Sequence, residues 1–259
     1  YGELWSTSLF AAYLAARRKA AAVARPVRWL DARQCVVVEW GALGPGVHWE
    51  TSRARLNETG VIDFTGTLLI PGFVARTPQG VQTTLGRNGS DFSASIFCAL
   101  LDAAEIHIWT DVDGVLSADP RRVPDAQVID SLSYSEAMEL AYFGAKVIHP
   151  QTMAPAVQER IPIWIKNTFA PDKPGTLIHE RSEPDPLVKG ITTIDRIALV
   201  NLEGAGMIGV PGTAHRLFGA LREEGISVIL ISQGSSEHSI CFAVPAGEAE
   251  RAERVVRRA

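Results

Sequence analysis

The chain has 259 residues, of which 46% are hydrophobic and 21% charged, so it can bury a sizeable core in one large domain or in a large and a small one. Its 25 basic and 29 acidic residues give a net charge of −4, which provides no general attraction to nucleic acid or to an anionic membrane. No apolar run approaches the roughly 20 residues that a membrane-spanning helix requires. Cys35, Cys98 and Cys241 are widely spaced in apolar segments, which favours buried thiols in a reducing cytoplasm over disulfides or a metal site.

The first predicted element is a helix over residues 1–18, whose apolar residues cluster on one side. No capping residue or loop stands in front of this helix, so we expect the sequence to begin inside a domain. Short apolar or β-branched runs predict strands at 27–30, 35–40 and 67–74, with stretches rich in glycine and proline between them.

The segment TTLGRNGSD, directly ahead of an apolar helix, has the composition of a site for a small charged ligand. Gly86 and Gly89 allow backbone conformations and close approaches that a Cβ would forbid. Ser90 and Asp91 lie where a helix N-terminus presents unpaired N–H groups, and Arg87 adds a planar fork that matches a carboxylate or a phosphate. An ordinary capping loop would explain Ser90 and Asp91, but it would explain neither the arginine nor both glycines.

The alternation of helix and strand continues after this segment. Ser133 and Glu136 form an S-x-x-E capping box, which predicts a helix that runs to residue 144. The other predicted elements are a helix at 90–104, a strand at 105–112, a helix at 153–159 and a strand at 161–168. This order predicts an α/β domain with a largely parallel sheet between helices.

Prolines with charged residues between them predict a linker at 180–187. Beyond it the predicted order is β-α-β-β-α, with strands at 197–202, 227–232 and 239–244 and helices at 212–224 and 246–258. This order is typical of a ferredoxin-like α+β unit without its last strand.

Residues 204–209 match G-x-G-x-x-G between a strand and a helix, the context of a dinucleotide-binding turn. Two observations count against nicotinamide cofactor binding. The next strand ends at Ser232 and Gln233 without an acidic residue for a ribose, and about 50 residues are too few to complete the fold of such a domain. We therefore interpret the glycines as the strand-to-helix crossing of a small effector-binding module.

Two further segments are typical of nucleotide contacts. Asp111 follows a predicted strand, where open α/β sheets bind ligands, and Arg121 lies close enough in sequence to reach a phosphate. Lys146 comes just after a helix-ending glycine and can extend a point charge toward a phosphoryl group. A plain turn at Asp111 and a solvated cation at Lys146 are the alternatives. His149 is expected to be a packed, hydrogen-bonded residue rather than a catalyst.

In combination these segments resemble the aspartokinases of the amino-acid kinase family. The matching strings, in order, are GELWST, PGF, TTLGRNGSD, WTDVDGV, ADPR, FGAKVIHP and IKNTFAPDKPGT. Residues 188–257 are similar to that family's first ACT regulatory domain, most of all to the threonine-sensitive type that is often fused to homoserine dehydrogenase. The resemblance implies an amino-acid-kinase-like catalytic domain at 1–180 and an ACT domain at 188–259.

The resemblance also implies an activity, namely ATP-dependent phosphorylation of the L-aspartate side-chain carboxylate to 4-phospho-L-aspartate, with Mg²⁺. This is the first step toward lysine, threonine and methionine. Because the accepting carboxylate is already ionised at neutral pH, no general base is needed. By position, Arg87 would bind the α-carboxylate of aspartate, Glu3 and Asp91 its ammonium group, and Phe73 and Ser90 would line the pocket. The ATP-binding residues would be Thr110, Asp111, Arg121 and Lys146.

In the second domain we expect Gln233, with Ser232 and Ser235 near it, to contact an amino-acid effector, threonine rather than lysine. A polar turn between two strands is the alternative. The unit stops before its final strand, and open strand edges favour association, so we expect a homodimer or a higher homo-oligomer through residues 188–259. Nucleic acid and membrane are not expected as partners.

The sequence departs from the family at two places. The lysine- and glycine-rich segment K-F-G-G-[ST] that opens aspartokinases is absent, so we expect this chain to lack the first part of the catalytic domain and to show little or no kinase activity by itself. Leu116 stands where relatives frequently have an aromatic residue that could stack near the nucleotide.

Rival functions make different structural predictions. A non-catalytic amino-acid sensor predicts that Arg87, Asp91 and Lys146 do not converge. A kinase for another substrate predicts that Glu3 and Asp91 do not bind one ammonium group together. The aspartate interpretation requires Glu3, Arg87 and Asp91 to face one cleft.

Overall fold

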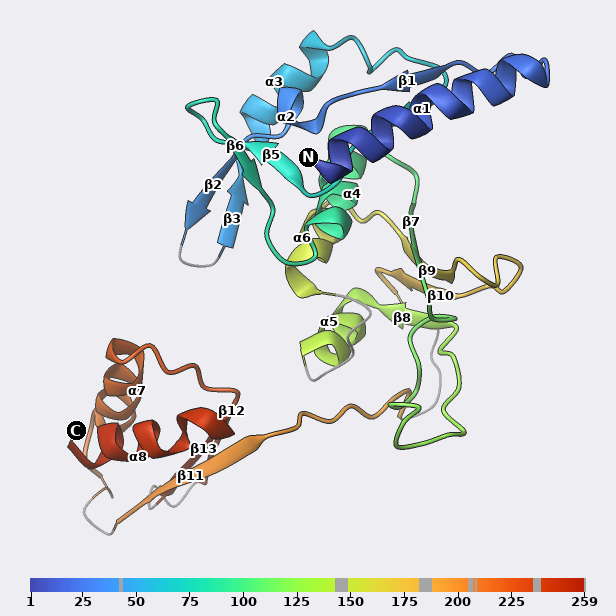
Figure 1. The fold of residues 1–259 in the computed structure, drawn as a ribbon. Coiled ribbons are helices and arrows are strands. Elements are labelled where there is room, and N and C mark those ends of the chain that lie inside the picture. The colour runs from blue at the N-terminus through green and yellow to red at the C-terminus, as the bar shows by residue number, and fades with distance from the viewer. Residues whose placement is uncertain are drawn as a thin grey trace. The chain divides into compact units, whose positions relative to one another are not determined.

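The computed structural model describes residues 1–41, 44–142, 149–181, 188–204, 207, 209–234 and 239–258. The chain forms two compact units, Tyr1–Thr192 and Thr193–Ala259. Figure 1 shows their elements. The predicted linker at 180–187 falls largely on residues 182–187, which lie outside the described residues.

The first half of unit 1 is built on a long helix and short strands around one apolar core. Its elements are α1 (Gly2–Ala20), β1 (Val27–Trp29), α2 (Ala32–Cys35), β2 (Val38–Gly41), β3 (Gly44–Val47), α3 (Trp49–Glu58), β4 (Thr67–Leu69), β5 (Val74–Arg76) and β6 (Gln82–Thr84). Strands β1 and β4 are parallel, whereas β2 with β3 and β5 with β6 form antiparallel hairpins. Leu4 of α1, Leu56 of α3 and Ile96 belong to the shared core.

The second half of unit 1 is a four-stranded sheet with helices packed against one face. Its elements are α4 (Gly89–Leu100), β7 (Ile106–Thr110), β8 (Ser131–Ser133), α5 (Tyr134–Tyr142), α6 (Pro150–Gln158), β9 (Ile163–Asn167) and β10 (Thr176–His179). The strand order is β7-β9-β10-β8, in which β7–β9 and β8–β10 are parallel and β9–β10 is antiparallel. Ile163, Ile165 and Ile178 are fully buried on the helix-covered face, which forms the second core. The α/β class is confirmed, with mixed sheets that contain the parallel pairs.

Unit 2 is a small α+β unit. Its elements are β11 (Ile197–Glu203), α7 (Thr213–Glu223), β12 (Leu230–Gln233), β13 (Ser239–Pro245), a short 3-10 turn η2 (Ala246–Glu248) and α8 (Ala249–Arg258). The described strands pair antiparallel in the order β11-β13-β12, which is the order of the first three strands of a ferredoxin-like unit. Phe242 is fully buried in the core that the sheet shares with α7 and α8.

Most predicted elements exist with shifted ends. The helix expected at 90–104 ends at Leu100, because Asp102 adopts a left-handed conformation (φ 50°) directly after it. The strand expected at 35–40 begins only at Val38, since Asp31 accepts a hydrogen bond from the Arg33 N–H and so caps a short helix that ends at Cys35. The predicted capping box is present: Glu136 N–H donates to Ser133 Oγ (3.2 Å) and Ser133 N–H donates to Glu136 Oε2 (2.7 Å).

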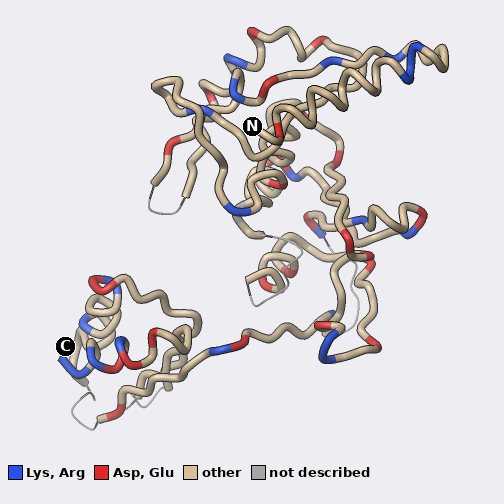
Figure 2. Tube along the Cα trace, in the orientation of Figure 1, with Lys and Arg blue, Asp and Glu red and all other residues tan. Residues whose placement is uncertain are grey.

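Charge is spread over both units. Figure 2 shows acidic and basic residues interleaved along the chain rather than gathered into one basic stripe. None of the helices that the described residues form has both the length and the apolar character of a membrane span.

Candidate functional site

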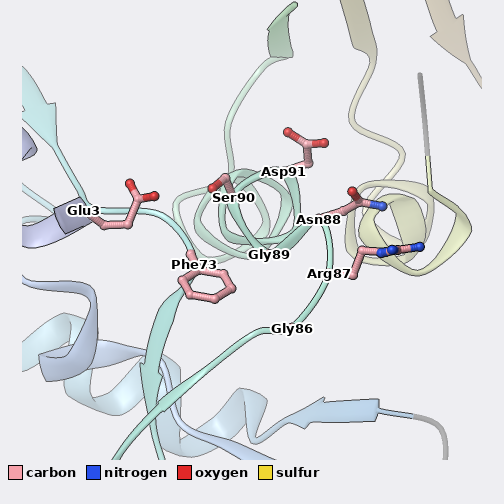
Figure 3. A pocket seen from close by; sticks show the side chains of 8 residues that line it. All are labelled: Glu3, Phe73, Gly86, Arg87, Asn88, Gly89, Ser90 and Asp91. Carbon is pink, nitrogen blue, oxygen red and sulfur yellow. The ribbon is translucent and has the colours of Figure 1, made fainter. Parts of the chain in front are cut away.

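A cavity of about 480 Å³ lies where α1, the start of β5 and the N-terminus of α4 meet. All five residues that the sequence assigned to an amino-acid substrate line this cavity. Its lining consists of Glu3, Phe73, Gly86, Arg87, Asn88, Gly89, Ser90 and Asp91. Figure 3 shows Ser90 and Asp91 on the first turn of α4, with Glu3 on one side and Arg87 on the other. The geometry thus places Glu3 beside residues that are 70 or more positions away in sequence, which local sequence patterns alone could not place together.

Glu3 is held at the cavity by the attachment of α1 to β1. The buried Leu4 next to it belongs to the first core. Trp29 Nε1 of β1 donates to Thr7 Oγ1 at 3.1 Å, and that hydroxyl donates in turn to the Glu3 carbonyl at 2.7 Å. The first turn of α1 is therefore fixed over the strand, and sequence reasoning had assigned no role to Thr7 or Trp29.

The charged groups of this cavity have no partners among the residues that the structure describes. Within the described part of the chain, the side chains of Glu3, Arg87 and Asp91 form no ion pair or hydrogen bond with another residue. Burial raises the pKa of the Asp91 carboxyl above its ordinary value. Asp91 is partly buried, and a partly buried charge without a partner is costly, whereas Glu3 and Arg87 are exposed. Three charges around one cavity, without partners among the described residues, indicate a site that a charged ligand completes.

The two glycines of TTLGRNGSD have separate structural reasons. Gly86 adopts φ +73°, which L side chains rarely adopt. A Cβ on Gly89 would lie 2.8 Å from Phe73 Cδ2 and 3.0 Å from Leu85 Cβ, so only glycine allows this close approach. The N-cap of α4 is Asn88, which places Ser90 and Asp91 in its first turn.

The outer surface of the same turn is covered by the β2–β3 hairpin. Trp40 of β2 donates from Nε1 to Thr83 Oγ1 at 3.2 Å, and a Cβ on Gly86 would lie 3.0 Å from Trp40 Cη2. The indole therefore rests on the backbone that leads into Arg87, although Trp40 itself does not line the cavity.

A second cluster lies at the carboxyl edge of β7 and β9, where the expected ATP-binding residues Thr110 and Asp111 are found. Thr110 and Asn167 are register partners at the ends of these parallel strands. Thr110 Oγ1 donates to Asp111 Oδ1 at 3.2 Å, and Asn167 Nδ2 donates to Asp113 Oδ1 at 2.7 Å. Lys173 Nζ lies 2.5 Å from Asp113 Oδ2, and this hydrogen bond is the main reason why the pKa of Asp113 is below its usual value.

Asn167, Asp113 and Lys173 are residues of this edge that sequence reasoning did not assign. The only signal was their presence in the strings WTDVDGV and IKNTFAPDKPGT, and their contact depends on the pairing of β7 with β9. Because the carboxyl ends of parallel strands meet at one edge, the cluster occupies the position where open α/β sheets bind ligands.

Arg121 and Lys146 are the other two residues expected to bind ATP. The Arg121 guanidinium donates from Nε and from one terminal nitrogen to the two Asp119 oxygens, at 3.0 and 2.7 Å. These bonds lower the pKa of Asp119 to about 2. Lys146 lies outside the described residues, so its convergence with Arg87 and Asp91 stays a prediction.

Unit 2 contains a separate cavity of about 330 Å³ at the N-terminus of α7. Gln233, the expected effector contact, lines it, and Ser232 precedes Gln233 on β12. The other lining residues are Met207, Gly209, Val210, Pro211, Gly212, Thr213, Ala214 and Ile240. Ser235 and part of the 204–209 glycine segment lie outside the described residues.

For His149, which was expected to be packed and hydrogen-bonded, the structure contradicts the expectation at one ring nitrogen. Its Nδ1 is buried, and no described residue hydrogen-bonds to it. The residue is the N-cap of α6, and its backbone carbonyl accepts from Thr152 Oγ1 at 2.7 Å. The backbone rather than the ring therefore makes the capping contact at this position.

Comparison with known proteins defines the class of the chain. The amino acid kinase family matches residues 1–167, and the ACT domain matches residues 200–259. The chain belongs to the amino acid kinase family. It is 46% identical over 254 residues to a bifunctional aspartokinase/homoserine dehydrogenase of Zea mays, an alignment that covers 96% of this chain and 27% of that protein.

Two solved structures of E. coli aspartokinase III share this fold. One is a complex with aspartate and ADP, in the R-state, and matches with a TM-score of 0.70 and 32% identity over 94% of this chain and 53% of that one. The other is a complex with lysine and aspartate, in the T-state, with a TM-score of 0.70 and 31% identity over the same shares. The chain thus spans about a quarter of the curated bifunctional relative and about half of the solved aspartokinase.

Proposed function

We propose that the cavity of unit 1 is the amino-acid site of an aspartate kinase, a phosphotransferase with a carboxyl group as acceptor. The observation that carries this proposal is the set of three charged side chains, Glu3, Arg87 and Asp91, that line one cavity and have no partners among the described residues. One cation and two anions complement a ligand that carries both an anionic and a cationic group. An α-amino acid is such a ligand, and aspartate is bound in the related E. coli structure.

The charged residues of the cavity are proposed to bind different parts of the amino acid. The planar fork of Arg87 suits the α-carboxylate, whereas Glu3 and Asp91 accept hydrogen bonds from the ammonium group. The side-chain carboxylate of aspartate remains free as the nucleophile. It is ionised at neutral pH, so the site needs to position it and does not need a general base.

The carboxyl edge of β7 and β9 has donors that fit a nucleotide with its metal ion. Asp111 and Asp113 offer the oxygen ligands that Mg²⁺ prefers, while Lys173 offers a cation for phosphate. Mg²⁺ is usually bound through one or two carboxylates together with substrate phosphates, so these aspartates would be sufficient protein ligands. When bound, ATP supplies the transferred phosphoryl group, and the product is 4-phospho-L-aspartate. Thr110, Asp111, Arg121 and Lys146 are the residues proposed to hold the nucleotide.

Unit 2 is proposed to bind an amino-acid effector at the cavity lined by Gln233, with Ser232 and Ser235 close to it. The E. coli relative binds lysine, whereas the Zea mays relative is fused to homoserine dehydrogenase, a pairing that favours threonine as the effector here. Association into a homodimer or a higher homo-oligomer through this unit is supported by exposed apolar residues on its strands, Leu199, Leu230 and Ile231.

The proposed domain bounds are 1–180 for the catalytic part and 188–259 for the ACT domain. The family matches at 1–167 and 200–259 lie inside these bounds. A reducing location, the cytoplasm, is supported by the three free cysteines. The proposed reaction would be the first step of lysine, threonine and methionine biosynthesis.

The test is calorimetric titration of the 259-residue chain with L-aspartate and with analogues that lack one charged group. Succinate lacks the ammonium group and β-alanine lacks the α-carboxylate. We expect each to bind at least about tenfold more weakly than L-aspartate, because each leaves a cavity charge unpaired. Equal binding of succinate would contradict the roles of Glu3 and Asp91. Tighter binding of L-glutamate would instead favour a kinase for another amino acid.

The effector proposal has its own titration. Threonine is expected to bind the chain more tightly than lysine, and Gln233→Ala is expected to weaken that binding. The absence of binding by both amino acids would remove the assignment of the unit 2 cavity.

A further inference from the structure

A buried serine behind the amino-acid cavity connects two of its walls. Ser93 lies one turn into α4, its side chain is 4% exposed, and it does not line the cavity. Its hydroxyl accepts a hydrogen bond from the Phe73 N–H at 2.8 Å and donates one to the Gly89 carbonyl at 2.8 Å. One oxygen atom therefore links the loop that carries Phe73 with the first turn of α4.

The linked segments are also in close contact. A Cβ on Gly72 would lie 3.1 Å from Ser90 Cα, and a Cβ on Gly89 would lie 2.8 Å from Phe73 Cδ2. The loop and the helix start thus pack at a distance that glycines on both sides permit.

Phe73 itself has an unfavourable backbone conformation. Its φ is +70°, a value that a bulky aromatic residue adopts only where its surroundings enforce it. Two hydrogen bonds hold the backbone here: Ser93 Oγ accepts from the Phe73 N–H, and the Phe73 carbonyl accepts from the Leu85 N–H at 2.8 Å. The second bond lies directly next to the β5–β6 hairpin, so the serine supplies the contact from the α4 side.

We propose that Ser93 is a positioning residue for the amino-acid site. Ser93 holds Phe73 in its left-handed conformation against the start of α4. In this way it sets the distance across the cavity between the Phe73 side chain and the turn that carries Arg87. It acts on the ligand through these two segments and does not touch it. The inference rests on the proposed amino-acid site and adds a residue to it that lies outside the cavity lining.

Ser95 provides a matched control in the same helix. It is 2% exposed, two residues from Ser93, and its side chain makes no hydrogen bond with another described residue. We expect Ser93→Ala to weaken L-aspartate binding about tenfold, since a bond to a strained backbone N–H is lost, and Ser95→Ala to change it less than about twofold. Ser93→Thr keeps the hydroxyl and is expected to retain most of the affinity. If Ser93→Ala does not fold, Ser93→Cys, with a weakly bonding thiol, takes its place and is expected to lose affinity similarly.

A second measurement reports on the positioning itself. Hydrogen exchange of the Phe73 amide is expected to be slow in the unmodified chain and in Ser95→Ala, and faster in Ser93→Ala. Equal aspartate affinity in the unmodified chain and in Ser93→Ala would overturn this inference and leave the proposed function intact. Unchanged exchange of the Phe73 amide would also overturn it. Failure of the unmodified chain to bind any amino acid would contradict the proposed function instead.

Discussion

In the cavity of unit 1, Glu3, Arg87 and Asp91 have no ion-pair partner in the described part of the chain, whereas at the carboxyl edge of β7 and β9 Asp113 pairs with Lys173. Asp119 and Arg121 form a second such pair in the segment that follows β7. Both regions contain carboxylates and cations close together. They differ in whether the protein satisfies those charges itself.

The difference indicates that the two regions hold their charges in different ways before a ligand binds. A partly buried charge without a partner, such as Asp91, raises the free energy of the empty protein, and a ligand of complementary charge removes that cost on binding. The exposed charges of Glu3 and Arg87 are free to pair with a ligand without first giving up another described partner. A charge that already has a partner is stable without ligand, so a ligand must exchange one ion pair for another. We therefore expect single substitutions in the cavity to affect ligand binding strongly and those at the strand edge to affect it weakly.

The largest effect is expected for Arg87→Ala. Hydrogen bonds to charged groups contribute about 1.5–3 kcal/mol, and truncation would leave the α-carboxylate of aspartate without its cation, so binding should weaken by about 10- to 150-fold. Calorimetric titration of L-aspartate measures this change.

Arg87→Lys separates charge from geometry. It keeps the cation but loses the planar fork. Its affinity for L-aspartate is therefore expected to lie between those of the unmodified chain and of Arg87→Ala. Arg254→Ala, a change at an exposed arginine in unit 2, controls for a general loss of positive charge. Unaltered aspartate binding by Arg87→Ala would contradict the proposed ligand orientation.

A smaller effect, about tenfold, is expected for Asp91→Asn, because one of two ammonium acceptors loses its charge while Glu3 remains. Burial raises the pKa of Asp91, so aspartate binding by the unmodified chain should weaken as the pH falls through that raised pKa. In Asp91→Asn, this part of the pH dependence of binding should be absent.

The same pKa shift predicts the opposite effect on stability. A folded-state pKa above the unfolded value means that the protein is favoured when Asp91 is protonated, and that this contribution is lost as the pH rises through the folded pKa. At neutral pH, Asp91→Asn should therefore melt at a higher temperature than the unmodified chain although it binds aspartate less tightly. A lower melting temperature at neutral pH would show that burial of the charge is not costly here.

A change of about threefold to fivefold in aspartate affinity is expected for Trp40→Ala. The indole covers Gly86 from outside and bonds Thr83, so its loss should loosen the turn that carries Arg87 without removing a group that touches the ligand. Trp109→Ala is the control, since Trp109 is 48% exposed and Trp40 52%, and Trp109 lies on β7 away from the cavity. Equal effects of the two changes would mean that the contact with Gly86 has no part in binding.

Local features of this structure could be predicted from sequence, and contacts between distant segments could not. The capping box of Ser133 and Glu136 spans four residues and was found as expected. The presence of Glu3 and Arg87 in one cavity was expected only from the family resemblance. The positive φ of Phe73 runs against the preference of its own side chain, and the contact of Asn167 with Asp113 requires the register of two strands far apart in sequence.

The smallest effect is expected for Lys173→Ala. This change removes one member of the Asp113–Lys173 ion pair and so tests the region whose charges already have partners. The Lys173 ammonium group is largely exposed and bound to Asp113, and exposed ion pairs contribute little, so aspartate affinity should change by less than about twofold. The pKa of Asp113 should rise toward its ordinary value in this variant, because the hydrogen bond from Lys173 is the main cause that lowers it. NMR titration of the Asp113 carboxyl measures that rise. A large loss of aspartate binding in Lys173→Ala would show that the strand edge and the cavity act as one site, and the contrast between paired and unpaired charges would then not describe how this protein binds its ligand.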